Sequence, residues 1–168
     1  MPLLIDGFNL LYKFPELEEL MYLEKLNEAR KGLLERLREY YSIKKVKIRV
    51  VFDGRRNPMD ALKSERSGAI DVFYSIDYSA DFLIKEFIKK DPNPKMTTVV
   101  TSDKDILFYV NRFKARTMTS EKFADHLNKT IEEYYAEKTV EKEEDPVLSE
   151  DEVSFWERIF RGKKPGKR

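Results

Sequence analysis

The segment Pro2-Leu3-Leu4-Ile5-Asp6-Gly7 is a short apolar run that ends at an aspartate and a glycine. A run of this length, bounded by a turn dipeptide, is typical of a buried strand that leads into a loop. The stretch from Val46 to Phe52, closed by Asp53-Gly54, has a similar form. It begins as an alternation and ends fully apolar, as expected near the middle of a parallel sheet. These two segments therefore predict the centre of a sheet.

Strands and helices are predicted to alternate along nearly the whole chain. Further strands are expected at Ala69–Ser75, Thr97–Thr101 and Ala115–Met118. Helices are expected from Pro15 to about Tyr41 (with a possible interruption at Gly32), from Ser79 to Lys90, from Ser102 or Asp103 to about Arg112, and from Ser120 to about Lys138. We expect a loop from Arg55 to Gly68, which contains Pro, Asn, Ser and Gly. The alternation predicts an α/β fold whose mainly parallel sheet is covered by helices on both faces.

The C-terminal part has a different composition. We predict a folded domain at residues 1–138, a charged linker at 139–148, a helix at 149–160 and a basic tail at 161–168. The helix would place Val153, Trp156, Ile159 and Phe160 on one face, and we expect Trp156 with Phe160 to dock it onto the domain. The tail has five basic residues and no acidic ones, which is typical of a solvated chain end.

The composition limits the possible chemistry. The chain has 168 residues, 41% of them hydrophobic, so it can bury a sizeable core. It has no apolar run near the roughly 20 residues that span a bilayer, and no signal peptide, so we expect a soluble cytoplasmic protein. With no cysteine and one histidine, His126, thiolate zinc sites and sites with several histidines are excluded. A metal would need carboxylate ligands, which favours magnesium or manganese.

Five aspartates follow the predicted strands. Asp6 and Asp53 end the first two strands, Asp103 and Asp105 follow the strand at Thr97–Thr101, and Asp81 lies in the first turn of the helix that Ser79 caps. The carboxyl ends of parallel strands meet at one edge of a sheet, where ligands bind. A cluster of like charges is unfavourable unless a cation lies among them. The pattern therefore predicts a divalent metal site.

Such a site suits the hydrolysis of phosphodiesters. Asn9 could add an amide that bonds the scissile phosphate or a water molecule of the metal site. The alternative for each aspartate is a structural cap or turn, above all for Asp53, which precedes Gly54, and for Asp103, which could cap its own helix. Capping does not require acids at equivalent ends of several strands, and this favours the metal site.

Four motifs resemble those of NYN-domain nucleases, in particular the YacP-like branch. In order they are Ile5-Asp6-Gly7-Phe8-Asn9-Leu10, Val51-Phe52-Asp53-Gly54, Ser79-Ala80-Asp81 with Ile84, and Val100-Thr101-Ser102-Asp103-Lys104-Asp105. The segment from Leu148 to Val153 and that from Trp156 to Phe160 are similar to the tail helix of that branch. One segment departs from the pattern, because Ser75-Ile76-Asp77-Tyr78 stands where a loop richer in Gly or Pro is expected.

The resemblance implies a PIN-like three-layer α/β/α sandwich and an endoribonuclease that depends on Mg²⁺ or Mn²⁺. Asp6, Asp81 and Asp103 match the acidic metal-site positions of the family, and Asn9 matches the polar residue of its first motif. Asp105 matches a further acidic position. Asp6, Asn9, Asp81 and Asp103 are therefore the candidate catalytic residues.

Five basic residues near the candidate acids could hold an RNA backbone: Arg55, Arg56, Lys63, Arg66 and Lys104. Their alternative role is to balance surface acids in a chain that is 38% charged. Phe8 and Tyr12 could stack on bases, although Phe8 also fits a core position. His126 is expected to be structural.

Two other classes of function compete with a ribonuclease. A non-catalytic RNA-binding or ribosome-associated module could use the same fold, but pure RNA binding favours neutral or basic groups where this chain has acids. A phosphatase of the haloacid-dehalogenase type needs Asp-x-Asp after the first strand, where this chain has Asp6-Gly7-Phe8. The absence of a Gly-rich loop there disfavours P-loop and Rossmann nucleotide binding. We therefore expect RNA as the partner, with the ribosome as a further candidate.

Overall fold

The computed structural model describes residues 1–54, 65–141 and 150–162, and within them the chain forms one six-stranded sheet. The strands are β1 (Leu3–Asp6), β2 (Ile48–Asp53), β3 (Glu65–Ser67), β4 (Ile70–Ser75), β5 (Thr98–Val100) and β6 (Arg116–Met118). Their order across the sheet is β3-β4-β2-β1-β5-β6, and each neighbouring pair is parallel except β3 with β4. β1 and β2 therefore occupy the middle, as predicted.

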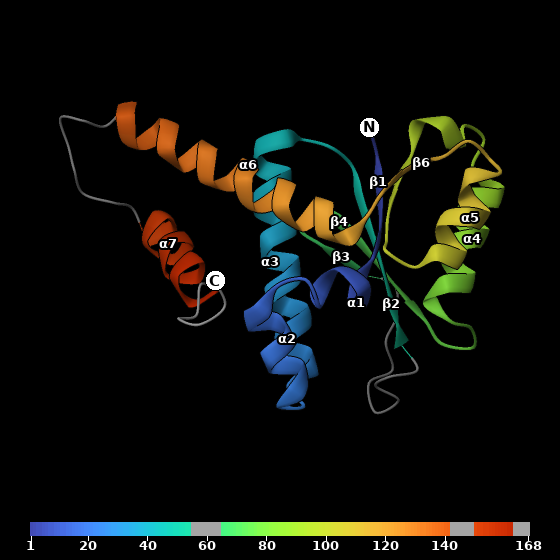
Figure 1. The fold of residues 1–168 in the computed structure, drawn as a ribbon, viewed down its shortest axis with the longest axis horizontal. Coiled ribbons are helices and arrows are strands. Elements are labelled where there is room, and N and C mark those ends of the chain that lie inside the picture. Colours follow the sequence, from blue (N-terminus) through green and yellow to red (C-terminus); the bar gives the residue numbers. More distant parts are fainter. Residues whose placement is uncertain (55–64, 142–149, 163–168) are drawn as a thin grey trace.

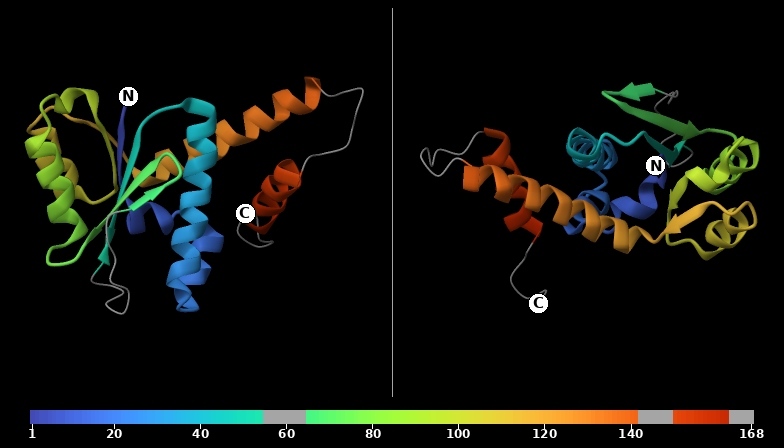
Figure 2. Two further views of the ribbon diagram at one scale, coloured as in Figure 1. Left: turned by 180° about the vertical axis from the view of Figure 1, so that it is seen from behind. Right: turned by 90° about the horizontal axis from the view of Figure 1, so that it is seen from above.

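Helices cover both faces of the sheet (Figures 1 and 2). They are α1 (Gly7–Leu11), α2 (Pro15–Tyr22), α3 (Leu26–Lys44), α4 (Ala80–Lys90), α5 (Lys104–Asn111), α6 (Ser120–Glu141) and α7 (Glu150–Gly162), with a 3-10 turn η2 at Pro94–Met96. α4 and α5 lie on one face, and α1, α3 and α6 lie on the other. This arrangement confirms the predicted three-layer α/β/α sandwich. In the part of the chain that the structure describes, no helix is long and apolar enough to cross a membrane.

The two layers are built by alternation along the central strands, because successive side chains of a strand point to opposite faces. In β1, Leu3 and Ile5 join the larger core with α1, α3 and α6, whereas Leu4 joins the smaller core with α4 and α5. In β2, Val51 joins the smaller core and its neighbours Val50 and Phe52 join the larger one. Burial on both faces explains why these strands have near-continuous apolar runs.

The predicted helix from Pro15 to about Tyr41 is wrong in two respects. The chain separates into α2 and α3 at residues 23–25, where Glu24 takes a positive φ of 58°, and not at Gly32. Gly32 lies inside α3, where an added Cβ would come within 2.5 Å of Leu17 Cδ2. The glycine therefore allows α2 and α3 to pack closely and does not interrupt the helix.

The predicted loop from Arg55 to Gly68 is also wrong at its end. Residues 65–67 form β3, an antiparallel edge strand that a turn through Gly68, at φ 64°, joins to β4. Arg38 of α3 supports this turn, because its Nη1 donates a hydrogen bond of 2.6 Å to Ser67 Oγ. A three-residue strand has too short a pattern to be detected by periodicity.

The C-terminal helix packs beside α6 and the start of α2 (Figure 1). Phe155 is its most buried described side chain, 3% exposed, and it stacks on Tyr135 of α6 with ring centroids 4.9 Å apart. Trp156 and Ile159 also contact the core, which confirms the expected docking at Trp156, whereas Val153 is 41% exposed. The side chain of Phe160 lies outside the described residues. α6 continues to Glu141, and three residues that we predicted as linker belong to it. The rest of that linker lies outside the described residues, as do tail residues 163–168.

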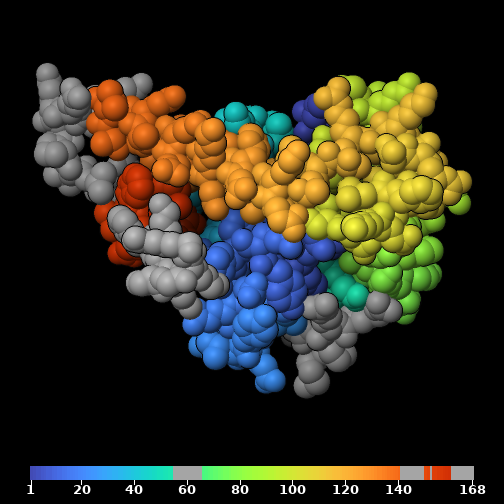
Figure 3. Space-filling model, in the orientation of Figure 1, coloured from blue at the N-terminus to red at the C-terminus, as the bar shows by residue number. Residues whose placement is uncertain are grey.

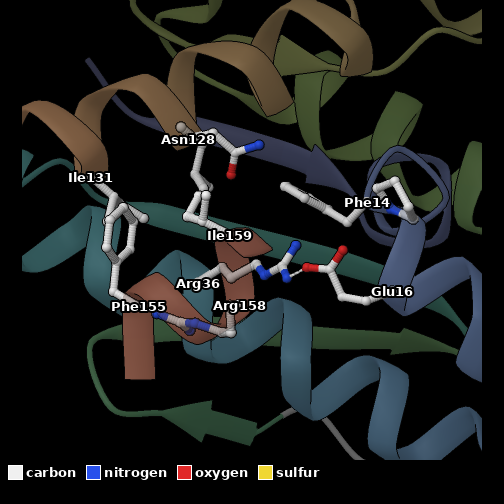
Figure 4. A pocket seen from close by; sticks show the side chains of 10 residues that line it. Phe14, Glu16, Arg36, Asn128, Ile131, Phe155, Arg158 and Ile159 are labelled. Carbon is white, nitrogen blue, oxygen red and sulfur yellow. Dashed lines mark ion pairs between the residues drawn. The ribbon is translucent and has the colours of Figure 1, made fainter. Parts of the chain in front are cut away.

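Charged side chains surround a small cavity of about 130 Å³ beneath α7 (Figure 4). Arg36 forms an ion pair with Glu16, and its guanidinium lies 4.5 Å from the centre of the Phe14 ring. Burial, followed by the nearby charge of Arg158, lowers the pKa of Arg36 to about 10. Arg158 in turn pairs with Glu39 of α3. The Arg158–Glu39 pair therefore joins α7 to α3, and the Arg36–Glu16 pair joins α3 to α2.

Candidate active site

The carboxyl edge of the sheet contains an acidic cleft of about 260 Å³. Four of its lining residues are aspartates that the sequence had singled out: Asp6, Asp53, Asp81 and Asp103. The remaining lining residues are Phe8, Asn9, Tyr12, Ser79, Ala80 and Ile106. Figure 3 shows this face of the molecule, where the segments around α1 (blue) and α5 (yellow) meet at the surface. The fold therefore brings together acids from four separate parts of the chain.

Asp6 is partly buried, and its pKa is shifted from the usual value of an aspartate. Its Oδ2 accepts a hydrogen bond of 2.9 Å from Thr101 Oγ1. Burial raises the pKa of Asp6 to about 6, and the negative charges of Asp103 and Asp81 add to that rise. The hydrogen bond from Thr101 acts in the opposite direction but does not outweigh burial. Asp6 is thus a carboxylate that lacks sufficient positive charge around it.

Asp103 has two roles at once. Its side chain caps α5, since Oδ1 accepts hydrogen bonds from the backbone N–H groups of Asp105 at 2.9 Å and Ile106 at 3.4 Å. Asp103 also lines the cleft and acts on the charge of Asp6. Capping and membership of the acidic cluster were weighed as alternatives from the sequence. The geometry allows both, because capping uses only one of the two carboxylate oxygens.

Asp81 and Asp105 share a lysine. Lys85 Nζ lies 3.0 Å from Asp81 Oδ1 and 2.5 Å from Asp105 Oδ2, and these contacts, led by the one to Asp105, raise the pKa of Lys85. Asp81 Oδ1 is buried and accepts no hydrogen bond of normal geometry from the described residues, so its contact with Lys85 is an ion pair. The side chain of Asp105 is 68% exposed and does not line the cleft. The structure thus places Asp105 outside the cleft, joined to Asp81 through Lys85.

Asn9 is held by its oxygen. Asn9 Oδ1 accepts hydrogen bonds from the backbone N–H of Ser102 at 2.8 Å and from Ser120 Oγ at 2.6 Å. A backbone N–H can only donate, so this contact fixes which end of the amide is the oxygen. The Nδ2 group is therefore the end that can serve the cleft, and Asn9 offers a hydrogen-bond donor there instead of a metal ligand.

A second layer of polar residues supports Asn9, and the sequence had not indicated it. Ser102 Oγ accepts from the backbone N–H of Ser120 at 3.0 Å and donates to Glu121 Oε2 at 2.6 Å. Lys13 Nζ lies 2.7 Å from Glu121 Oε1, and this contact, together with Ser102, lowers the pKa of Glu121 to about 2. The sequence feature that could have indicated these residues is the Ser120-Glu121 pair, because it stands at the start of a helix that follows a predicted strand.

The two candidate RNA-binding cations that the structure describes, Arg66 and Lys104, do not line the cleft. Arg55, Arg56 and Lys63 lie outside the described residues. Arg66 is on the edge strand β3, 72% exposed and 3.7 Å from Asp71, and Lys104 is exposed without lining the cleft. Neither position supports a direct role in the cleft.

Phe8 and His126 have structural contacts, whereas Tyr12 lines the cleft. Phe8 is 6% exposed and packs edge to face on Phe52, with ring centroids 5.1 Å apart, so it belongs to the core that floors the cleft. His126 Nε2 lies 3.0 Å from Tyr40 Oη and does not line the cleft. This agrees with the structural role expected for His126.

The charge and donor types of the cleft fit an oxygen-liganded divalent cation. Asp6 lacks compensating charge, and Asp81 Oδ1 is a buried oxygen without a normal hydrogen bond. In residues 1–54, 65–141 and 150–162, however, no three acidic side chains converge closely enough to hold one ion together. A cation held by Asp6, Asp81 and Asp103 therefore requires side-chain movement of at least one of them.

Comparisons with known proteins agree with this architecture. Two crystal structures of Rae1 (YacP) from Bacillus subtilis have the same fold. A mutant form aligns with a TM-score of 0.67 at 21% identity over 98% of this chain and 93% of its own. The other aligns with a TM-score of 0.64 at 24% identity over 96% and 95%. No curated protein sequence matches significantly. The sequence profile of the YacP-like NYN domain matches residues 3–161, and the chain belongs to this family.

Proposed function

We propose that the protein is an endoribonuclease that depends on Mg²⁺ or Mn²⁺ and cleaves RNA at the acidic cleft. The observation that carries the proposal is the partly buried carboxylate of Asp6, which lines the cleft with Asp81 and Asp103 and has a pKa raised to about 6. Concentrating negative charge in this way costs stability, and a structural role does not require it. Membership of the YacP-like NYN family supports RNA as the substrate.

The side chains divide the work between them. Asp6, Asp81 and the second oxygen of Asp103 would hold the metal, which when bound activates water and neutralises charge on phosphoryl oxygens. Asn9 Nδ2 would donate a hydrogen bond to a non-bridging oxygen of the scissile phosphate. Ser102 and Ser120 hold the Asn9 amide in that orientation through its oxygen. The notch is compact, so we propose single-stranded RNA, either free in the cytoplasm or presented by the ribosome.

The direct test is incubation of labelled single-stranded RNA with purified wild-type and Asp103→Asn protein, with Mn²⁺ or with EDTA. We expect cleavage only by the wild type with metal. Cleavage of equal rate by both proteins would exclude the cleft as the active site. If the wild type leaves free RNA and RNA on ribosomes intact, and binds RNA equally in EDTA, the protein is instead an RNA-binding module on a nuclease fold.

A further inference from the structure

An exposed pair of stacked aromatic rings lies next to the acidic cleft. Tyr78 and Phe82 are 55% and 44% exposed, and their ring centroids are 4.7 Å apart at an interplanar angle of 28°. The residues between them include Ser79, Ala80 and Asp81, all of which line the cleft. The two rings therefore flank the segment that supplies one of the proposed metal ligands.

We propose that Tyr78 and Phe82 form a stacking platform for one base of a single-stranded RNA whose backbone enters the acidic cleft. The proposal rests on the proposed function and names the subsite that would hold the nucleotide. Aromatic faces are the usual means by which proteins bind unpaired bases, since every base has a π face. Tyr78 and Phe82 directly precede and follow the cleft residues Ser79, Ala80 and Asp81, so a nucleotide adjacent to a phosphodiester bound in the cleft would be near the two rings.

The rings have a simpler structural use, which the test must separate. Tyr78 precedes the N-cap Ser79, and Phe82 lies in the first turn of α4, so their contact resembles the hydrophobic staple that fixes the entry of a chain into a helix. A staple needs apolar contact but no aromatic face. It also explains the contact between the rings without explaining why about half of each ring remains open to solvent.

Leucine separates the two roles, because it keeps apolar contact and removes the ring. The double variant Tyr78→Leu/Phe82→Leu is compared with a matched control, Tyr22→Leu/Phe108→Leu, whose rings are 75% and 74% exposed and do not line the cleft. Both are made in full-length Asp103→Asn protein, so that RNA stays intact. The probe is a fluorescent 12-nucleotide oligoadenylate with Mn²⁺ present, measured by anisotropy.

We expect the Tyr78/Phe82 variant to bind the oligonucleotide roughly 5- to 100-fold more weakly and the control to bind within twofold of the parent. An abasic residue at one position of the RNA should weaken binding to the parent by a similar factor and cause no further loss in the Tyr78/Phe82 variant. Equal binding by the two double variants would overturn the proposal. The proposal would also be overturned if every abasic substitution weakened binding by the Tyr78/Phe82 variant as much as it weakens binding by the parent. It would be overturned as well if the parent protein bound no RNA.

A fold defect is recognised by the thermal unfolding transition. If the leucine variant shows no cooperative unfolding transition, the variant Tyr78→Trp/Phe82→Trp is tested in its place. It keeps an aromatic ring at both positions and should bind the RNA at least as tightly as the parent. Weaker binding would overturn the platform. The platform and the nuclease fail separately. If the protein cleaves RNA with Mn²⁺ at the same rate with and without the two aromatic rings, only the platform is rejected. If RNA binding depends on the rings but no RNA is cleaved, only the nuclease proposal is rejected.

Discussion

The two edges of the sheet are both hollowed, but their aspartates are in different states. The amino edge has the larger hollow, about 410 Å³, lined by residues that include Arg49, Lys90 and Asp91. There Asp91 Oδ1 accepts from the backbone N–H of Asn93 and Oδ2 from Thr97 Oγ1, both at 2.8 Å. At the carboxyl edge, Asp6 accepts hydrogen bonds from Thr101 and from the backbone of Asn9, but it also has two like-charged neighbours, Asp81 and Asp103, and its pKa is raised.

The contrast separates a structural carboxylate from a functional one. Asp91 is satisfied by partners within six residues of the chain, and its hydrogen bonds close a turn. Asp6 meets its partner Thr101 only through the pairing of β1 with β5, and the same pairing brings Asp103 near it. The volume of a hollow therefore does not identify the candidate active site. The site is identified by the carboxylate of Asp6, whose charged neighbours Asp81 and Asp103 are also negative.

The largest expected effect comes from replacing one carboxylate by an amide at each edge of the sheet, which tests the contrast between Asp6 and Asp91 directly. Asp6→Asn should lower kcat/KM for RNA about 1,000-fold, because a lost metal ligand removes several kcal/mol of transition-state stabilisation. Asp91→Asn should leave kcat/KM within twofold. Both are measured with labelled RNA and Mn²⁺. Comparable losses at the two edges would mean that Asp6 acts through the fold and not through the reaction.

The second prediction concerns stability and has the opposite sign. The pKa of Asp6 is raised from 3.8 to about 6, so the folded state binds this proton more tightly than the unfolded state does. The associated stability is complete below pH 4 and is lost as the pH rises through 6. Without metal, Asp6→Asn should therefore be more stable than wild type by about 3 kcal/mol at pH 8, and the difference should vanish near pH 4.

Urea unfolding of both proteins in EDTA, from pH 4 to pH 8, measures this difference. Asp91→Asn is the control, because it loses a hydrogen-bonded carboxylate and should be destabilised at pH 8. A wild type that is more stable than Asp6→Asn at pH 8 would show that the charge of Asp6 is already compensated in the folded protein.

The carboxyl edge could be predicted because its acids follow from topology. The apolar runs that end at Asp6 and Asp53 identify buried parallel strands, and such strands end at one edge whatever their loops do. The contacts that distinguish one acid from another could not be predicted. That Asp105 turns to Lys85, away from the cleft, depends on the packing of α4 against α5. No spacing in either helix encodes it.

Backbone details were missed for a related reason. The separation of α2 from α3 depends on one residue, Glu24, with a positive φ that glutamate rarely adopts, whereas Gly32, the usual sign of a break, serves close packing. The orientation of Asn9 depends on Ser120, which is 111 residues away. Local pattern predicts elements well, but tertiary contacts decide breaks and side-chain orientation.

The third prediction compares the two edges by removing one hydroxyl group at each. Ser120→Ala removes the bond to Asn9 Oδ1 at the carboxyl edge, and Thr97→Val removes the bond to Asp91 at the amino edge. Residues that orient an active group typically contribute 10- to 100-fold, so Ser120→Ala should lower kcat by about tenfold with KM nearly unchanged. Thr97→Val should affect only thermal stability. A change in KM alone after Ser120→Ala would instead indicate that Asn9 binds ground-state RNA.

The smallest expected effect concerns the two lysines of α4. Lys85 lies between Asp81 and Asp105 at the carboxyl edge, whereas Lys90 pairs with Glu86 near the amino edge at 3.4 Å. If Lys85 holds the place of a cation beside Asp81 Oδ1, then Lys85→Met removes a competitor, and Mn²⁺ should bind two- to fivefold more tightly, consistent with the roughly 0.2–1 kcal/mol of an exposed ion pair. Lys90→Met should leave the affinity unchanged. Isothermal titration with Mn²⁺ measures both, and weaker binding by Lys85→Met would mean that the lysine positions Asp81 for the metal and does not compete with it.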